Sequence, residues 1–349
     1  MRIAYWNTSP LEPEVEAVSR EVFSLAGAFP GSWILGFNPH LGLRFSPRKR
    51  CVGIGSRHYA LARVLFPLLA RRFDLHHVYG DLTPWIFHKT LRRGPMVHTV
   101  TQAVSGPESS FLQRCDAVVA QVPSVRDVVL RAGVHPAKVH LRLPGLDLSR
   151  YAPVDAQRAP SPEPRILFAT APRAAEEMAG RGVNLLVEAA ARAADLGFRF
   201  LYRTWRTGYT SLEATRRLIA TSGVRNIELT DGVVRSMQEA YQAADLTVIP
   251  FTTADGGKEC PNSALESLAC GVPVIISRAC PFAAFVEEHR CGVAFDPGAD
   301  ALVEAARTAL SRWSELSRAA RAAAEAHLDW KATVAFYQQL YTTLLDAKR

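Results

Sequence analysis

Residues 255–277 (DGGKECPNSALESLACGVPVIIS) constrain the fold of this chain more than any other stretch. The pattern is typical of a turn, then a helix that starts near Pro261 with short polar side chains able to cap it, and a helix stop at Gly271. The apolar run that follows predicts a strand buried on both faces. A glycine-containing loop before a helix N-terminus favours a bound anion. Glu266, one turn into the helix, would lie beside the group that carries the anion, which suggests a nucleotide.

Short strands alternate with helices in both halves of the 349-residue chain, and this predicts two α/β domains with parallel, doubly wound sheets. We expect strands at residues 3–6, 33–37, 76–79, 96–100, 117–121 and 139–143, and again at residues 166–169, 198–202, 227–229, 246–250, 274–276 and 293–295. A polar, proline-rich segment at residues 152–164 marks a domain boundary. The predicted domains are residues 1–152 and 165–328, with a C-terminal helix at about 329–349 that packs back on the first.

The expected helices lie between these strands, at residues 14–26, 57–72, 84–91, 108–114, 124–132, 183–196, 211–222, 235–244 and 262–270, with further helices in 299–346. Residues 38–56, rich in Gly, Pro and Arg, are expected to form a long loop with a functional role. The helix at 57–72 is interrupted by Pro67 and mixes leucines with four arginines. Two interpretations stay open: it lies at a membrane interface, or it packs on the sheet with its arginines in solvent.

The positive charge of the chain is confined to its first half. Residues 1–150 contain 19 Lys and Arg against 10 Asp and Glu, a net of +9, and the remaining 22 against 23 give a net of −1. Such a field favours an anionic partner, such as an anionic membrane surface, a lipid phosphate or an acidic acceptor. No basic stripe interleaved with aromatic residues is present, so we expect no nucleic-acid partner.

Composition also indicates the compartment. No stretch approaches the ~20 apolar residues that a membrane span needs, and the N-terminus reads as a first strand rather than a signal peptide. The six cysteines show neither a CxxC pair nor metal-ligand spacing with histidine. We therefore expect a cytoplasmic protein with free thiols, whose basic first half would allow peripheral attachment to the inner face of the membrane.

A series of motifs in order resembles the family 4 (group 1) retaining glycosyltransferases of the GT-B fold. They are 73–78 (FDLHHV), 115–121 (CDAVVAQ), 143–147 (LPGLD) with Tyr151, 165–169 with Arg173 and 181–183 (RGV), 241–250 (YQAADLTVIP) and 261–274 (PNSALESLACGVPV). The resemblance implies two Rossmann-like, doubly wound domains that face each other across a cleft. It further implies a nucleotide-diphosphate sugar in the C-terminal domain and an acceptor in the basic N-terminal domain.

The resemblance also implies roles for single residues. Arg173 and Arg181 match the cations that hold the donor diphosphate and stabilise charge on the leaving phosphate. Glu266 matches the carboxylate that accepts hydrogen bonds from the ribose hydroxyls. The other implied donor-binding residues form two groups. One group leads into and begins the helix of motif 261–274, here called the signature helix: Lys258, Glu259, Cys260, Pro261, Asn262 and Ser263. The other is a loop whose backbone would lie along the nucleobase edge: Asp231, Gly232 and Val233. No Asp-x-Asp motif is evident, which fits a metal-independent enzyme. We expect no cofactor, and the nucleotide sugar is a co-substrate.

Three positions depart from the family pattern. Lys258 stands where the family has a glutamate that contacts the donor sugar, so either Glu259 takes that role or the donor sugar differs, for example by being anionic. Thr101 aligns with a histidine near the reacting centre, and His98, three residues earlier on a strand, would face the other side. Residues 13–14 (PE) replace a glycine pair. Activity is still expected, because the leaving phosphate can take the proton of the acceptor.

The sequence therefore predicts transfer of a sugar, with retention, from a nucleotide sugar to a glycan, lipid-linked or small-molecule acceptor. Two alternatives stay open. One is a nucleotide-sugar epimerase, which the signature helix supports less well. The other is a weak or inactive GT-B module that binds a glycan or a partner enzyme, although such a module has no evident use for the diphosphate and ribose positions.

Overall fold

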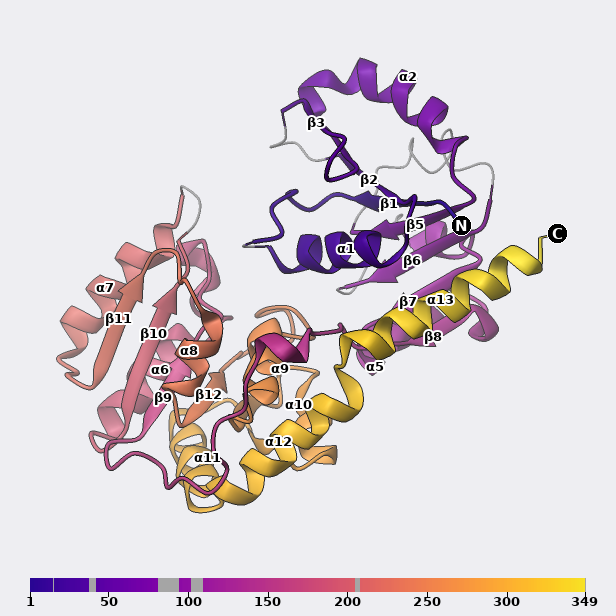
Figure 1. Cartoon of the computed structure of the whole chain (residues 1–349). Helices are drawn as coiled ribbons and strands as arrows, with labels where there is room; N and C mark the ends of the chain where they lie inside the picture. Colours follow the sequence, from indigo (N-terminus) through magenta and orange to yellow (C-terminus); the bar gives the residue numbers. More distant parts are fainter. Residues whose placement is uncertain (15, 38–41, 81–93, 102–108, 205–207, 349) are drawn as a thin grey trace. The chain divides into compact units, whose positions relative to one another are not determined.

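The computed structural model describes residues 1–14, 16–37, 42–80, 94–101, 109–204 and 208–348 of the chain (Figure 1). These residues form two compact units. The first unit contains Met1–Gly145 and Lys331–Arg349, and the second contains Leu146–Trp330. Each unit has a sheet of its own, and the predicted boundary segment 152–164 belongs to the second unit.

The first unit is built on an eight-stranded sheet with the order β3-β4-β2-β1-β5-β6-β7-β8. Its strands are β1 (Ile3–Asn7), β2 (Trp33–Phe37), β3 (Arg44–Ser46), β4 (Cys51–Ile54), β5 (Leu75–Tyr79), β6 (Met96–Val100), β7 (Ala117–Ala120) and β8 (Val139–Leu141). All neighbours pair in parallel except β3 and β4. Every residue of β1 and β5 is buried, as expected for central parallel strands with both faces covered.

The prediction of a loop over residues 38–56 is wrong, because residues 44–46 and 51–54 form strands β3 and β4. Strand β4 is buried and pairs with β2, with Cys51 opposite Ile34. The Arg50 N–H donates to the Pro47 carbonyl at 3.0 Å and closes the turn between the two strands. The arginines and prolines that suggested a loop lie largely in this turn and in the exposed edge strand β3. That edge strand is antiparallel, so the first sheet is not wholly parallel.

The helices of the first unit are α1 (Ala17–Ala28), α2 (Tyr59–Ala70), α4 (Ser109–Leu112), α5 (Pro123–Arg131) and α13 (Trp330–Asp346). Helices α1 and α2 lie on opposite faces of the sheet (Figure 1). Helix α2 continues through Pro67, which the sequence suggested as an interruption. Two tyrosines of α13 reach the strands: the Tyr341 hydroxyl lies 2.6 Å from His77 Nδ1, and that of Tyr337 lies 2.8 Å from Thr99 Oγ1. The helix predicted at 84–91 lies outside the described residues.

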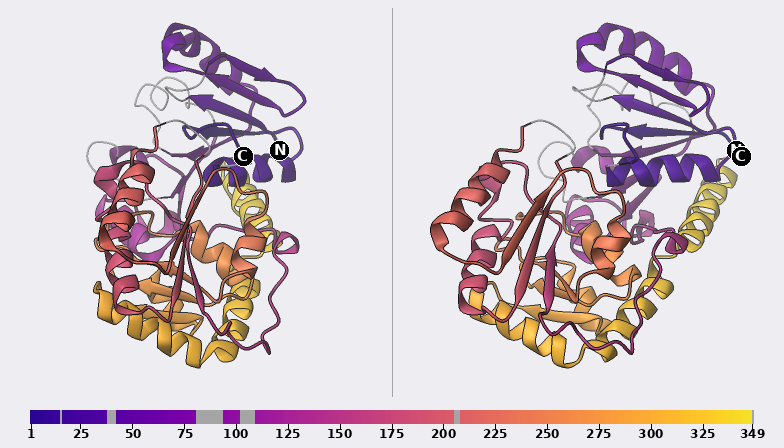
Figure 2. Two further views of the ribbon diagram at one scale, coloured as in Figure 1. Left: turned by 90° about the vertical axis from the view of Figure 1, so that its left-hand side faces the viewer. Right: turned by 60° about the vertical axis from the view of Figure 1, so that its left-hand side comes forward.

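The second unit is built on a six-stranded parallel sheet with the order β11-β10-β9-β12-β13-β14. Its strands are β9 (Arg165–Phe168), β10 (Gly197–Tyr202), β11 (Ile227–Asp231), β12 (Leu246–Ile249), β13 (Val274–Ser277) and β14 (Gly292–Phe295). Its helices are α6 (Val183–Arg192), α7 (Thr210–Ser222), α8 (Met237–Gln242), α9 (Asn262–Ala269), α10 (Ala283–Glu288), α11 (Ala299–Ser311) and α12 (Trp313–His327). They lie on both sides of the sheet (Figure 2), which confirms the predicted doubly wound fold. The six-residue helix α10 was not predicted.

The proline-rich segment 152–164 is fixed to the second unit by a buried carboxylate. Asp245, only 1% exposed, accepts from Arg158 at 2.8 Å and from the backbone N–H groups of Ser161 and Arg165 at 3.2 and 2.9 Å. The Arg158 guanidinium also lies over the Trp313 ring, 4.4 Å from its centroid. A buried charge needs such compensation, so this segment is an ordered strap on the second unit although its composition is that of a linker.

Candidate functional site

The strand order of the second sheet indicates where a ligand binds. Strand β9 comes first in this unit, the chain then runs outward through β10 and β11, and it returns to the other side of β9 with β12. In doubly wound folds, ligands bind at the carboxyl ends of the strands beside such a reversal point. The loops that leave β9 and β12, residues 169–182 and 250–261, meet this description. They carry Arg173, Arg181 and the predicted residues 258–261.

Arg181 lies in the first of these loops and contacts the second. Its guanidinium carbon is 5.2 Å from the centroid of the Phe251 ring, and a Cβ added to Gly257 would lie 2.7 Å from Arg181 Nη1. Its Nε is buried and has no hydrogen-bond partner in the described part of the chain. Burial lowers the pKa of this guanidinium, but arginine remains charged at neutral pH. Arg181 thus places a positive charge, with an unused N–H donor at Nε, at the reversal point.

Glycines allow the two loops to approach each other. A Cβ on Gly256 would collide with the Gly180 carbonyl oxygen, and a Cβ on Gly182 would collide with that of Pro250. Gly182 also has a φ of 80°, which side-chain-bearing residues rarely adopt. The spacing of these loops therefore depends on glycine at both contacts, a role that the sequence analysis did not assign.

Helix α9 begins without a side-chain cap. The predicted capping by short polar side chains is wrong, since Pro261 occupies the N-cap position and makes no side-chain cap hydrogen bond. The Ala264 N–H donates to the Pro261 carbonyl oxygen at 3.0 Å, whereas the N–H groups of Asn262 and Ser263 precede the first intrahelical bond, which makes this end a site for an anion. The Ser263 hydroxyl in this turn is buried and has no partner among the described residues. As predicted, the helix ends before Gly271, which adopts a φ of 69°.

Glu266 lies inside the unit, and two tyrosines orient its carboxylate. It is 4% exposed, and its Oε1 and Oε2 accept from the hydroxyls of Tyr151 at 3.0 Å and Tyr241 at 3.1 Å. Burial and the Glu266 carboxylate hold the pKa of Tyr241 well above its usual value, so this phenol remains a donor. A carboxylate has about four acceptor positions, and the two tyrosines use two of them. Both tyrosines lie in or beside the motifs found in the sequence, but only the tertiary structure shows that they are partners of Glu266.

Residues 258–260 lead directly into the helix. Lys258 and Glu259 are half-buried, and Cys260 is buried. The Cys280 thiol lies 3.8 Å from the Glu259 carbonyl oxygen and packs against this segment. The contact predicted between Glu259 and the donor sugar stays a prediction.

Arg173 and the loop after β11 are more exposed than the residues around α9. The guanidinium carbon of Arg173 lies 5.8 Å from the centroid of the Tyr209 ring. Asp231 ends β11, and its carboxylate accepts from Arg216 at 3.1 Å. Gly232 has a φ of 110°, and the Val233 side chain after it is 69% exposed. The Gly232 N–H donates to the Tyr202 carbonyl oxygen at 3.0 Å, and the nucleobase edge predicted for this loop stays a prediction.

Thr101 belongs to the first unit, whereas all the predicted donor-binding residues belong to the second. It is half-buried and follows β6, next to residues outside the described ranges. His98 on β6 is buried, and its Nε2 lies 3.2 Å from the Gly80 carbonyl oxygen. Burial lowers the pKa of His98 to about 4, so this imidazole is neutral at pH 7. The catalytic role of Thr101 stays a prediction.

Comparison with known sequences identifies relatives. Residues 164–312 match the family model of glycosyl transferases group 1, and this range includes every predicted donor-binding residue. The D-inositol 3-phosphate glycosyltransferase of Geodermatophilus obscurus is 30% identical over 256 residues, which are 68% of this chain and 55% of that protein. The chain thus spans about half the length of the curated relative that it matches.

Solved structures establish the fold. A sucrose-phosphate synthase from Thermosynechococcus elongatus superimposes with a TM-score of 0.76 at 20% identity, covering 99% of both chains. Anabaena Alr3699/HepE in complex with UDP-glucose superimposes with a TM-score of 0.75 at 14% identity, covering 99% of this chain and 100% of that one. The family match over residues 164–312, the two α/β units and these neighbours confirm the predicted resemblance to the group 1 glycosyltransferases (family GT4) and the GT-B fold.

Proposed function

We propose that this protein transfers a sugar, with retention of anomeric configuration, from a nucleotide sugar held by the second unit to an acceptor held by the first. One observation carries the proposal: three of the eight buried polar atoms without a partner in the described part of the chain lie in the loop after β9 or at the start of α9, beside the reversal point. They are Thr170 Oγ1, Arg181 Nε and Ser263 Oγ. Buried polar atoms in folded proteins are nearly always bonded, so these three are best explained as contacts to a polar ligand.

The chemistry asks for stabilisation of a leaving diphosphate. The bond from the sugar C1 to the diphosphate oxygen breaks, and a bond from C1 to the acceptor oxygen forms on the same face. The proton of the acceptor passes to the leaving diphosphate. Negative charge grows on that group, and Arg181, Arg173 and the uncapped start of α9 are proposed to stabilise it. Glu266, held by two tyrosines, would bind the ribose hydroxyls.

The proposed donor is a UDP-hexose. The Anabaena neighbour binds UDP-glucose, and this protein shares its fold. Lys258 introduces a cation beside the start of α9 where the family has a carboxylate. We keep both consequences: Glu259 contacts a neutral sugar, or the sugar carries an anionic group that Lys258 binds. A panel of UDP-glucose, UDP-N-acetylglucosamine and UDP-glucuronate separates them.

The acceptor is proposed from charge. The net charge of +9 in residues 1–150 favours a phosphate-bearing acceptor, either a small molecule, a glycan or a lipid-linked sugar. The curated relative is named for a phosphorylated inositol.

In the part of the chain that the structure describes, no helix has both the length and the apolar character that a membrane crossing needs. We propose a cytoplasmic enzyme that also attaches to anionic membranes.

The experiment is a donor panel with two readouts. Thermal stabilisation by UDP and by each UDP-sugar reports binding, and release of UDP reports turnover, with the anomeric product assigned by NMR. Replacing Arg181 by Met should lower kcat about 100-fold or more, as loss of an oxyanion contact does elsewhere. Arg192→Met is the matched control, since Arg192 lies on α6 and pairs with Glu188 on the surface.

Each outcome of the panel favours one interpretation. Turnover with retention supports the proposal. Binding without turnover indicates a weak or inactive module, and a changed sugar on an intact nucleotide indicates an epimerase. If the protein neither binds nor turns over any of the donors, the proposed function is contradicted.

A further inference from the structure

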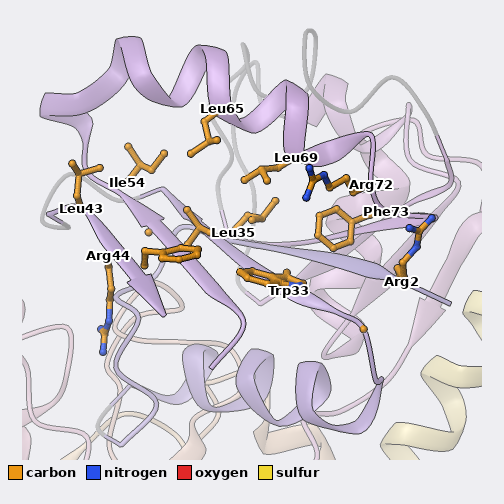
Figure 3. Close-up of a pocket in the computed structure, with 14 residues that line it drawn as sticks. Arg2, Trp33, Leu35, Leu43, Arg44, Ile54, Leu65, Leu69, Arg72 and Phe73 are labelled. Atoms are coloured by element: carbon orange, nitrogen blue, oxygen red, sulfur yellow. The ribbon is translucent and has the colours of Figure 1, made fainter. Parts of the chain in front are cut away.

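The first unit contains a cavity of about 650 Å³ between helix α2 and the sheet (Figure 3). Leu65 and Leu69 project from α2 toward Leu35 and Trp33 on β2, so the walls are largely apolar. Phe45 and Val52, from β3 and β4, complete this side of the lining. The volume lies within the range of about 300–1,000 Å³ that is typical of ligand pockets.

The cavity follows from how α2 is attached. Only one narrow stripe of the helix, Ala62, Phe66 and Ala70, is buried. Phe66 packs edge-on against Trp6, with 5.3 Å between ring centroids, and fixes the middle of the helix. Leu65 and Leu69 flank this stripe and are only half-buried. Gly31 and Gly53 are also among the lining residues and contribute no side chain to the cavity.

The surface around the cavity is both apolar and basic. Leu43, Phe45, Leu61, Val64 and Leu68 are large exposed apolar residues, and all lie on α2 or in and beside β3. Strand β3, the turn after it, and α2 with the residues on either side of it carry basic residues: Arg44, Arg48, Lys49, Arg50, Arg57, Arg63, Arg71 and Arg72. An exposed apolar patch marks an interaction site, and its cationic surroundings favour an anionic amphiphile over a neutral one.

The three arginines that line the cavity differ in their side-chain partners. Arg2 pairs with Asp74 at 3.0 Å, and Arg44 donates to the Leu11 carbonyl oxygen at 2.7 Å. The Arg72 side chain is exposed and makes no hydrogen bond or ion pair with any residue that the structure describes. Figure 3 shows Arg72 beside Phe73 at one end of the lining. A charged head group bound there would allow an attached hydrocarbon chain to contact the apolar walls.

We propose that this cavity binds the hydrocarbon chain of an anionic membrane phospholipid, with the phosphate at Arg72. The exposed apolar residues of α2 would then contact the surrounding lipid. A chain held in the cavity would attach the first unit to a membrane more firmly than surface charge alone, because each buried methylene adds to the affinity. The inference does not depend on the proposed sugar transfer, since none of the lining residues belongs to the predicted donor site.

The test uses the full chain with octyl, decyl and dodecyl phosphate, each below its micelle concentration. Affinity is measured by calorimetry and by the change in Trp33 fluorescence, with Trp33→Phe identifying the signal. We expect affinity to rise about fourfold per added methylene until the cavity is full. The matching alkanols, which lack the phosphate, should bind at least tenfold more weakly, and Arg72→Glu should reduce the binding of the alkyl phosphates to the same level.

Matched variants of the protein test whether the alkyl chain of the ligand lies in the cavity. Leu69→Trp fills the cavity and should lower the affinity for dodecyl phosphate at least tenfold, whereas Leu68→Trp, on the exposed side of the same helix, should leave it unchanged. Leu65→Trp fills the cavity from the preceding turn and serves if Leu69→Trp does not fold. Binding that ignores chain length, or that survives both fillings, overturns the proposal. So does a dimer of the wild type that Leu69→Trp dissociates, because a second copy would then occupy this surface.

Discussion

Helices α9 and α2 show how differently two helices of one chain can use their apolar residues. Seven of the eight residues of α9 (NSALESLA) are buried, although the helix contains two serines, an asparagine and a glutamate. Only three of the twelve residues of α2 (YALARVLFPLLA) are buried, although its sequence is the more apolar of the two. Burial is therefore decided by what surrounds a helix and not by its own hydrophobicity.

The polar residues of α9 have a use inside the second unit. Ser267 donates to the Val272 carbonyl oxygen at 2.9 Å and lies 2.8 Å from Thr247 Oγ1, and Glu266 is held by two tyrosines. Helix α2 leaves leucines in solvent and a cavity on its inner side, and the described chain offers neither of them a partner. A helix whose contacts are all internal serves the fold and the site, whereas one with apolar residues left over indicates a partner outside the chain.

The largest expected difference between the two helices is in stability. Leu268→Ala, in α9, should lower the free energy of unfolding by about 2–5 kcal/mol, because the side chain is fully buried. Leu68→Ala, at a 56% exposed position of α2, should change it by less than about 0.5 kcal/mol. Urea unfolding followed by circular dichroism measures both. An equally large loss for Leu68→Ala would show that the outer side of α2 is packed and would end the comparison.

The second prediction concerns membranes. Replacing Arg48, Lys49 and Arg50 by Glu should weaken binding to anionic liposomes by about two orders of magnitude at low salt, at about 1 kcal/mol for each basic residue. Flotation at increasing salt measures this. The matched control replaces three exposed arginines of the second unit, Arg217, Arg225 and Arg235, and should have little effect. If the wild type binds no liposomes at all, α2 has no membrane role.

The third prediction tests the site at α9. Glu266→Ala should weaken UDP binding about 10- to 100-fold, since a hydrogen bond to a charged group contributes roughly 1.5–3 kcal/mol. Calorimetry with UDP measures the dissociation constant. Glu188→Ala, at an exposed position of α6, is the control. An unchanged dissociation constant in Glu266→Ala, in a protein that still folds, would contradict the ribose contact.

The smallest expected effect belongs to a positioning residue. Tyr241→Phe removes one of the two phenols that orient Glu266, and should weaken UDP binding about fivefold, corresponding to roughly 1 kcal/mol. In a background that already carries Glu266→Ala, the same change should have no further effect on affinity. A loss that persists in the double variant would mean that Tyr241 acts on the nucleotide by another route.

Local pattern was enough for much of the second unit. The alternation of strands and helices, the bounds of α9 and the stop at Gly271 could be predicted, because each rests on neighbours a few residues apart. The family and the GT-B fold could be predicted as well, since the motifs occur in order along the chain. Strands β3 and β4 were missed because their basic turn hides two short strands, whose pairing with β2 is a tertiary contact.

The sequence by itself thus determined the fold class and the resemblance to a family, and it predicted which residues a donor would meet. Only the tertiary structure decided how those residues are held. Glu266 takes its orientation from Tyr151, 115 positions earlier, and Arg181 takes its place from Phe251 on another loop. The cavity under α2 likewise is lined by residues of β2, β3, β4 and α2, which lie far apart in the chain. Such contacts join residues far apart in the chain, so no periodicity or local motif could have predicted them.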